Sequence, residues 1–522
     1  MADALSTKNN NTAARHQLCA DASAAEGEFM KKFLACLLML SMLMSVLMAS
    51  GCADTGEETP ETTAGAAATT EAIPETTEAP GDDDLELDPS LNFNNETFTM
   101  LLRADRAGAV DEFLVSADDP ADTVKTAISA RQYFVEGQLG VTISYETVNE
   151  GELIARVRNN IASGYVVDVI CAAAFQAPTL AAEGLVANLL EIPHLNFDKV
   201  WWGSRSDMAK NLTIGDKLYM ASGDASQLTL GKGLCMYFNE ELLETQGGRT
   251  SEMLYDEVNN LNWTIDRLFE ISKEYSRDDG NQDWDQNDIY GCNIYLKTII
   301  DGYFAAFDQP IVAFENDQYK IAMNNDRMVT IVEKLNQLLY SDNATYITSS
   351  KGNSEKFFIE GHTLFTHGGM EWGVDFNSSE INGGFGIIPY PMLDKEQGKY
   401  YSALSDVYTM FLVPGNATNL DKIGAVLELT ASKSYETTTV AYFEVLLKSR
   451  VANDVNAMQM LDIIHDGLCY EFGFTYSAAL GNPAQAFRTL LASSSSANWS
   501  SYWASKGSTF QKQLDAMMEQ YE

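Results

Sequence analysis

The sequence predicts a protein of the α/β class. Between residues 98 and 170, short apolar runs alternate with helical stripes of apolar residues, and the run at 166–170 is apolar at nearly every position. Such alternation is typical of a parallel sheet covered by helices on both faces. The chain has 522 residues, 45% of them hydrophobic, which is enough for two or three structural units.

Each element rests on its own pattern of apolar residues. The expected strands are residues 98–102, 141–145 and 166–170. The expected helices are residues 124–139, 153–161 and 328–339, which place their apolar side chains on one face. Gly140 and Gly164 follow two of these helices and predict where they end.

The charge of the chain excludes one class of function. The formal net charge is −40, and residues 53–90 hold twelve Asp and Glu without any Lys or Arg. A surface this acidic repels phosphate groups, so we expect no nucleic-acid partner.

The N-terminal region predicts export and a lipid anchor. Residues 30–52 contain a basic start, an apolar run over 33–48 and small residues before Cys52, as in a secretory signal peptide. With Cys52 as first mature residue, the segment resembles a bacterial lipobox; the alternative is a membrane anchor, although the run is shorter than the roughly 20 residues needed to span a bilayer. Residues 1–29 do not resemble a signal start, so we expect them to be a non-native extension.

Residues 53–90 are expected to be a disordered tether. They are rich in Thr, Glu, Ala and Pro and contain no aromatic residue. A stretch of this composition cannot bury a hydrophobic core. A tether behind a lipidated cysteine would hold a folded body away from the membrane.

Four segments resemble the extracellular solute-binding proteins of ABC sugar importers, the class of maltose-binding protein. They are residues 183–224, 234–244 (LCMYFNEELLE), 383–414 and 431–450. The resemblance covers about residues 91–480. It implies a two-lobed periplasmic-binding-protein-like fold with hinge strands and a ligand cleft between the lobes.

The resemblance also implies lobe boundaries and a function. Lobe one would comprise 91–217 plus 405–450, and lobe two 222–400 plus 451–522. The protein would bind a sugar or oligosaccharide and deliver it to the membrane subunits of an importer, with no cofactor. A surface-anchored carbohydrate-active enzyme and a signalling receptor are the alternatives, but no G-x-S-x-G or P-loop motif indicates an enzyme.

A sugar site needs an aromatic platform and polar groups that bind hydroxyls. Trp372 follows an apolar strand and two glycines, and the resemblance places an aromatic of this loop in the cleft; the alternative is a loop anchor. Glu371 beside it is a candidate hydroxyl acceptor.

Further candidates follow strands or lie at the expected hinge. They are Asp224, Phe175, Gln176, Asp406 and Tyr408. Asp224 could instead cap a turn. Arg103 ends the first strand and is expected to form a salt bridge.

Adjacent residues on an extended chain point to opposite faces, so at most one residue of the Trp201–Trp202 doublet would face a ligand. The resemblance implies that the doublet is structural, and we expect both residues to be core. Beyond Cys52 the four cysteines are widely spaced, which predicts reduced thiols, with one long-range disulfide left open.

Residues 277–288 resemble a calcium loop of the same family. Asp279, Asn281, Asp285 and Asp288 could supply oxygen ligands. Arg277 stands where an acidic ligand is expected, so we expect no metal and interpret the loop as an acidic surface turn.

Overall fold

The computed structural model describes residues 85–521, apart from 107, 116–121, 204–205, 317, 377–380, 382, 452–453 and 494–497. The chain divides into two compact units, residues 1–78 and 79–522, and all described residues belong to the second. The expected extension, the signal peptide with Cys52, and the tether up to residue 84 lie outside the described residues.

The folded body begins before residue 91. Leu85 and Leu87 pack against the hydrophobic core, and Glu86 lies 3.5 Å from the ammonium group of Lys199. The last six residues of the expected tether therefore lie on the body, because two leucines interrupt its run of acidic residues.

The first sheet has the strand order β12-β3-β1-β2. Its strands are β1 (Glu96–Arg103), β2 (Val141–Val148), β3 (Val169–Ala173) and β12 (Thr409–Leu412). β1 pairs in parallel with β2 and β3, whereas β12 is antiparallel to β3. We call the unit around this sheet lobe one.

Helices cover lobe one as the sequence pattern predicts. They are α2 (Thr123–Leu139), α3 (Leu153–Ser163), α4 (Ala177–Ala182), α5 (Met208–Leu212) and α14 (Leu420–Glu436). α2 begins at Asp122, whose carboxylate accepts a hydrogen bond from the Lys125 backbone N–H. It ends at Gly140, whose φ of 59° is left-handed and therefore favours glycine.

The second sheet has the order β10-β4-β9-β5-β8 and forms the centre of lobe two. Its strands are β4 (Leu234–Asn239), β5 (Tyr290–Tyr295), β8 (Thr345–Thr348), β9 (Thr363–Gly369) and β10 (Phe385–Ile388). Around it pack α7 (Glu240–Gly247), α8 (Ser251–Asn259), α9 (Ile265–Tyr275), α10 (Thr298–Ala306), α11 (Asp326–Tyr340), α12 (Lys351–Ile359), α13 (Trp372–Asp375), α16 (Val455–Asp466) and α18 (Pro483–Ser493). A separate hairpin pairs β6 (Val312–Glu315) with β7 (Gln318–Ile321).

Two segments carry the chain between the sheets, side by side. The first crossing, residues 221–233, contains α6 (Gln227–Gly231), and the second crossing spans residues 402–411. They pair antiparallel at Ala221 with Phe411 and at Gly233 with Leu404. The second crossing also begins with β11 (Ser402–Ala403), which pairs with β13 (Leu468–Cys469).

The C-terminal part connects the lobes again. A π-helix (Val440–Leu447) packs on α2 of lobe one and continues through α15 (Lys448–Val451) to α16 of lobe two. After α17 (Phe472–Thr475) and α18, the last helix, α19 (Trp499–Tyr521), contacts β7 and α11 and then α4 of lobe one. At its end, the Tyr521 carbonyl accepts a hydrogen bond of 2.6 Å from Lys217.

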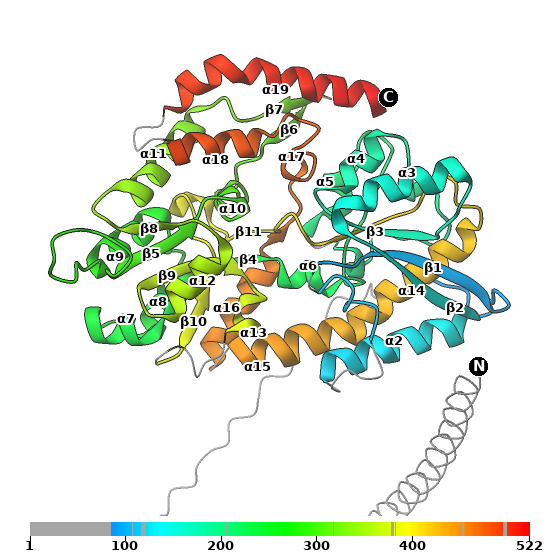
Figure 1. The fold of residues 1–522 in the computed structure, drawn as a ribbon, viewed down its shortest axis with the longest axis horizontal. Coiled ribbons are helices and arrows are strands. Elements are labelled where there is room, and N and C mark those ends of the chain that lie inside the picture. Colours follow the sequence, from blue (N-terminus) through cyan, green and yellow to red (C-terminus); the bar gives the residue numbers. More distant parts are fainter. Residues whose placement is uncertain are drawn as a thin grey trace, which may run out of the picture. The chain divides into compact units, whose positions relative to one another are not determined.

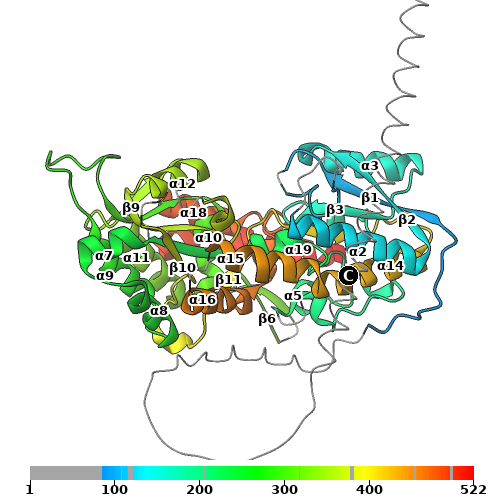
Figure 2. The same ribbon diagram turned by 90° about the horizontal axis from the view of Figure 1, so that it is seen from below.

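The two sheets with their helices form separate groups in Figures 1 and 2, joined by the crossings. The predicted α/β fold with two lobes and hinge strands is confirmed. No helix among the described residues is long and apolar enough to cross a membrane. The four described cysteines, Cys171, Cys235, Cys292 and Cys469, are free thiols.

Candidate functional site

Charged side chains gather where the sheet of lobe one meets the second crossing. Arg103, the last residue of β1, is buried, and its guanidinium donates hydrogen bonds to the Glu150 carboxylate (3.2 Å), the Val407 carbonyl (3.1 Å) and the Thr409 hydroxyl (2.9 Å). Arg106 donates to both oxygens of Glu150. Burial opposes ionisation of Glu150, but the two arginines outweigh it and lower its pKa. Glu150 therefore keeps its negative charge.

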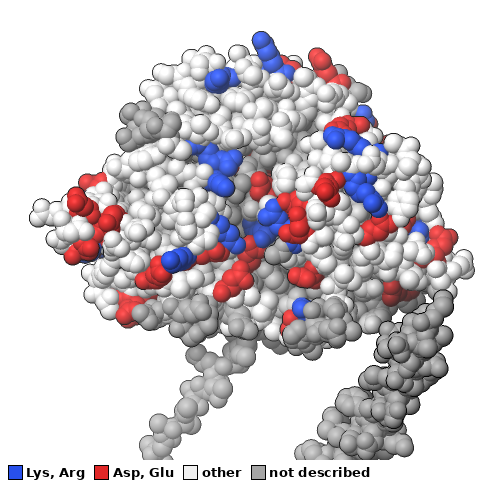
Figure 3. Space-filling model, in the orientation of Figure 1, with Lys and Arg blue, Asp and Glu red and all other residues white. Residues whose placement is uncertain are grey.

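Lobe two contributes a second ion pair near the crossing. Arg488 on α18 lies 3.2 Å from Asp301 on α10. Asp406, on the crossing itself, has a pKa raised by burial, which Arg488 and Arg106 oppose and Glu150 reinforces. Charged groups of both lobes thus influence the pKa of Asp406. Figure 3 shows charged side chains of both signs gathered around the middle of the face that it draws.

An exposed aromatic ring stands at the same edge of the sheet. Phe175 lies two residues after the end of β3 and has 41% of its surface exposed, while its backbone N–H donates to the Asp406 carbonyl at 3.1 Å. Gln176 is buried and donates to the Glu150 carbonyl at 2.7 Å. The Tyr408 carbonyl accepts from the backbone of residue 174. The structure therefore brings together four of the residues predicted from sequence, Phe175, Gln176, Asp406 and Tyr408.

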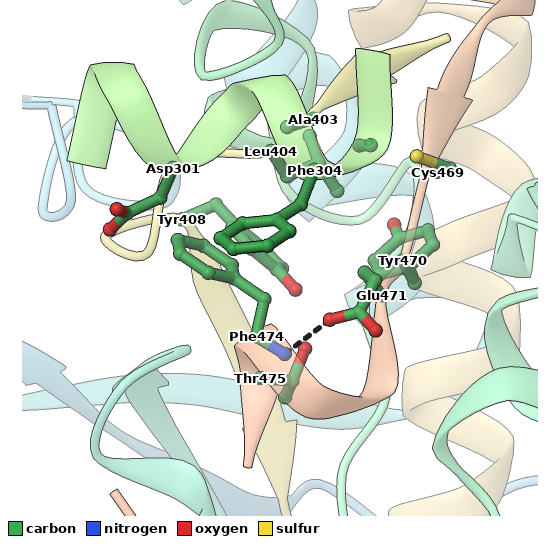
Figure 4. A pocket seen from close by; sticks show the side chains of 11 residues that line it. Asp301, Phe304, Ala403, Leu404, Tyr408, Cys469, Tyr470, Glu471, Phe474 and Thr475 are labelled. Atoms are coloured by element: carbon green, nitrogen blue, oxygen red, sulfur yellow. Dashed lines mark hydrogen bonds between the residues drawn. The ribbon is translucent and has the colours of Figure 1, made fainter. Parts of the chain in front are cut away.

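A small cavity lies beside Asp301 and Tyr408. Figure 4 shows Asp301 at one end, Cys469 at the other, and the rings of Phe304, Tyr408 and Phe474 between them. Its free volume is about 20 Å³, which is space for about one water molecule. The cavity is therefore sized for a single small group at the edge of the charged site.

A larger hollow of about 410 Å³ shares one wall with this cavity. The common wall is formed by Phe304, Ala305, Cys469, Tyr470 and Glu471. Glu471 has a structural role, because its carboxylate accepts hydrogen bonds from the backbone N–H groups of Ile311 (2.9 Å) and Phe474.

Trp372 and Glu371 lie elsewhere in lobe two. Trp372 is only 2% exposed, and a Cβ added at Gly368 would lie 2.5 Å from its ring. The expected binding platform is therefore a packed residue in this structure, because the turn into α13 folds the ring back onto β9. Glu371 pairs with Lys232 and lies 3.8 Å from Lys351.

Asp224 is engaged within the first crossing. Its carboxylate accepts a hydrogen bond of 2.7 Å from the Thr439 hydroxyl, which ties the crossing to the segment before the π-helix.

The loop at 277–288 uses its side chains to hold its own backbone. Asp279, Asn281 and Asp285 each accept a hydrogen bond from the N–H group two residues ahead. Both oxygens of the buried Asp288 accept from the N–H groups of Asp279 (2.8 Å) and Asp285 (2.6 Å). Oxygens of Asp278, Asp279 and Asp288 lie within 4.8 Å of one another.

Trp201 and Trp202 are each 1% exposed, which confirms that they belong to the core. The expected extended backbone was wrong, since both residues lie in a 3₁₀ helix (Val200–Trp202). Their indole N–H groups donate to the two carboxylate oxygens of Glu428, at 3.0 and 2.7 Å.

Four charged residues of the site were not predicted from sequence. Arg106 and Glu150 follow the first two strands, so the rule that ligands bind at the carboxyl ends of strands could have found them. Asp301 and Arg488 lie on helices about 190 residues apart, and no local pattern marks either one.

The fold and this arrangement define a two-lobed binding protein, and comparison with known proteins gives its family. Residues 130–431, more than half of the chain, match the family described as bacterial extracellular solute-binding protein. The chain belongs to this family. The predictions of a solute-binding protein rather than an enzyme, and of an extracytoplasmic location, are thereby confirmed. No protein in a search of curated sequences matches the chain.

Solved structures of binding proteins share the fold. The cyclic α-maltosyl-1,6-maltose-binding protein of Arthrobacter globiformis is 16% identical, with a TM-score of 0.53 over 81% of this chain and 99% of the other. The galacto-N-biose/lacto-N-biose I-binding protein of a Bifidobacterium longum ABC transporter is 11% identical, with a TM-score of 0.52 over 82% and 98%. M. tuberculosis UspC is 14% identical, with a TM-score of 0.53 over 81% and 100%. At these identities the likeness concerns the fold.

Proposed function

We propose that this protein binds a carbohydrate between its lobes and delivers it to the membrane subunits of an ABC importer. Two of the structures that share its fold are described as binding oligosaccharides, and one of these belongs to an ABC transporter.

The observation that carries the proposal is an exposed aromatic ring beside charged groups of both signs. A sugar ring offers a flat apolar face that packs on a ring such as Phe175, while its hydroxyls donate to carboxylates and accept from guanidinium groups. Three arginines (Arg103, Arg106, Arg488) and three acidic residues (Glu150, Asp301, Asp406) supply both donors and acceptors here. Such a mixed set suits the hydroxyl groups of a sugar, which both donate and accept hydrogen bonds.

The position of these groups suits a hinged receptor. Arg106 and Glu150 belong to lobe one, Arg488 belongs to lobe two, and Asp406 lies on the crossing. A solute that contacts both lobes binds more tightly when they approach, so it shifts the population towards the closed form. An importer that recognises the closed form would then distinguish loaded from empty protein.

Attachment to the membrane through Cys52 is part of the same proposal. The apolar run before Cys52 and the acidic stretch after it support a lipid anchor followed by a spacer. Such an anchor keeps the binding protein near the importer without a membrane-spanning helix.

The test is a thermal-shift screen of the soluble body against mono- and oligosaccharides, with amino acids and dipeptides as negative classes. A ligand at 100 times its dissociation constant should add about 2.7 kcal/mol to the free energy of unfolding. Asp406→Asn and Phe175→Ala should weaken binding about tenfold, equivalent to about 1.4 kcal/mol.

The matched controls are Asp198→Asn and Phe314→Ala, which alter exposed residues outside the site. They should bind like the unchanged protein. Stabilisation by amino acids or dipeptides but by no sugar would refute the proposal.

A further inference from the structure

One buried carboxylate of lobe one, that of Glu112, contacts both crossings. On the first crossing its donors are the Ser226 hydroxyl and the Leu228 backbone N–H, the latter at 3.0 Å. On the second crossing its donor is the Thr409 hydroxyl, at 2.6 Å. Hydrogen bonds to a carboxylate are strong, and burial removes water as a replacement partner, so the Glu112 side chain holds the two crossings firmly.

Glu112 is itself fixed to the helices of lobe one. Its backbone carbonyl accepts a hydrogen bond of 2.6 Å from Arg131, a buried residue of α2. Arg131 also donates to the Ser434 hydroxyl of α14 at 3.0 Å, and its guanidinium lies 5.5 Å from the centre of the Phe113 ring. The Glu112 carboxylate therefore moves with α2 and α14, and so do the parts of the crossings that it holds.

The first crossing passes from one lobe to the other within a few residues. Leu228 is bound to lobe one through Glu112. The Gly231 carbonyl accepts a hydrogen bond of 3.0 Å from the backbone N–H of Glu371, which belongs to lobe two. Only residues 229–230 lie between these two attachments, so a change in the angle between the lobes must bend the first crossing there.

The second crossing has an equally short free stretch. The Asp406 carbonyl accepts from the backbone N–H of Phe175 in lobe one. Leu404 pairs with Gly233, which directly precedes β4 of lobe two. Only Ser405 lies between these attachments, and its N–H donates across to the first crossing, so the two bending points are neighbours.

We propose that Glu112 is a positioning residue of the hinge, which pins both crossings to lobe one and confines the turning of the lobes to residues 229–230 and Ser405. This inference rests on the proposed function, because a receptor that closes around a solute needs a defined pivot. Asp406 directly follows the second bending point, so a solute that contacts Asp406 acts at the pivot itself. Without the pin, longer parts of both crossings would bend, and the lobes would sample a wider range of angles.

The experiment measures distances between the lobes of the full chain without a solute. Nitroxide labels are attached through p-acetylphenylalanine at the exposed positions of Ala155 on α3 and Glu333 on α11, which leaves the seven cysteines unlabelled. Pulsed electron paramagnetic resonance then gives the width of the distance distribution. Glu112→Gln offers one acceptor oxygen in place of two, and we expect it to broaden the distribution about twofold. Ser226→Ala removes a hydroxyl whose partner among the described residues is Glu112, and it should broaden the distribution less.

The matched control is Glu428→Gln, which alters a buried carboxylate of the same lobe whose hydrogen bonds stay within lobe one. It should leave the width of the distribution unchanged. The inference is refuted if folded Glu112→Gln keeps the width of the unchanged protein, or if Glu428→Gln broadens the distribution as much. Should Glu112→Gln not fold, an unchanged width in Ser226→Ala refutes the inference instead. No solute is present in this measurement, so its failure leaves the proposed function standing, and that function is tested separately by the sugar screen.

Discussion

Glu428 offers a direct test of how burial controls ionisation in lobe one. The side chain lies on α14 with 3% of its surface exposed, and it accepts hydrogen bonds from the indole N–H groups of Trp201 and Trp202 and from the Asn196 backbone. Burial raises its pKa from an ordinary value of 4.5 to about 7, although these hydrogen bonds and Lys199 oppose the shift. The protonated form is therefore favoured in the folded protein.

The sign of the pH dependence follows from this direction. A carboxyl group whose pKa is raised on folding gives its full contribution to stability below about pH 4.5 and loses it as the pH rises through about 7. The difference between the two pKa values corresponds to about 3 kcal/mol of unfolding free energy. Glu428→Gln cannot titrate, and its amide oxygen can accept from only one of the two indoles at full strength.

Urea denaturation of both proteins at pH 5 and pH 8 measures this effect. Other groups with shifted pKa values contribute equally to both proteins and cancel in the comparison. We expect the unchanged protein to be the more stable at pH 5, by about 1–3 kcal/mol for a lost hydrogen bond. Between pH 5 and pH 8 the difference should change by about 2.5 kcal/mol, so that the advantage disappears or reverses. A difference that stays constant between the two pH values would show that Glu428 is ionised in the folded state.

Three further predictions concern other parts of the chain. Cys52→Ala should leave the protein without lipid and release it into the medium, and its retention on membranes by an uncleaved helix would contradict the lipobox interpretation. Trp372→Ala should lower the unfolding free energy by about 3–5 kcal/mol, because it empties a packed site, whereas Phe314→Ala on the surface should change it little in the same denaturation experiment. The loop at 277–288 should bind calcium no more tightly than micromolar, since Arg277 replaces an acidic ligand, and calorimetry that finds a tighter site would overturn this expectation.

Much of the fold could be predicted because its elements obey local rules. The expected helix at 124–139 matches α2 within one residue, since a one-sided apolar stripe and a following glycine define it. The third strand was predicted at 166–170 but occupies Val169–Ala173, because an apolar run does not show where pairing with β1 begins.

The proposed binding site was only partly predictable. Phe175 and Asp406 could be found because one follows a strand and the other lies at the expected hinge. Trp372 was expected to face the cleft, but a glycine-flanked tryptophan after a strand can turn either outward or back onto the sheet. Here it packs over Gly368. The pairing of Asp301 with Arg488 depends on the packing of α10 against α18, which no local pattern in the sequence encodes.

The position of β12 affects how the protein can be made and exported. In the sheet of lobe one, Cys171 of β3 pairs with Phe411 of β12, so the sheet lacks an edge strand until 412 of the 522 residues have been synthesised. Pairings between residues so distant in sequence form slowly. A chain destined for the outside of the cell must cross the membrane before it folds. The late edge strand therefore gives the export machinery time to engage an unfolded chain, and moving β12 next to β3 by circular permutation should speed folding and reduce export.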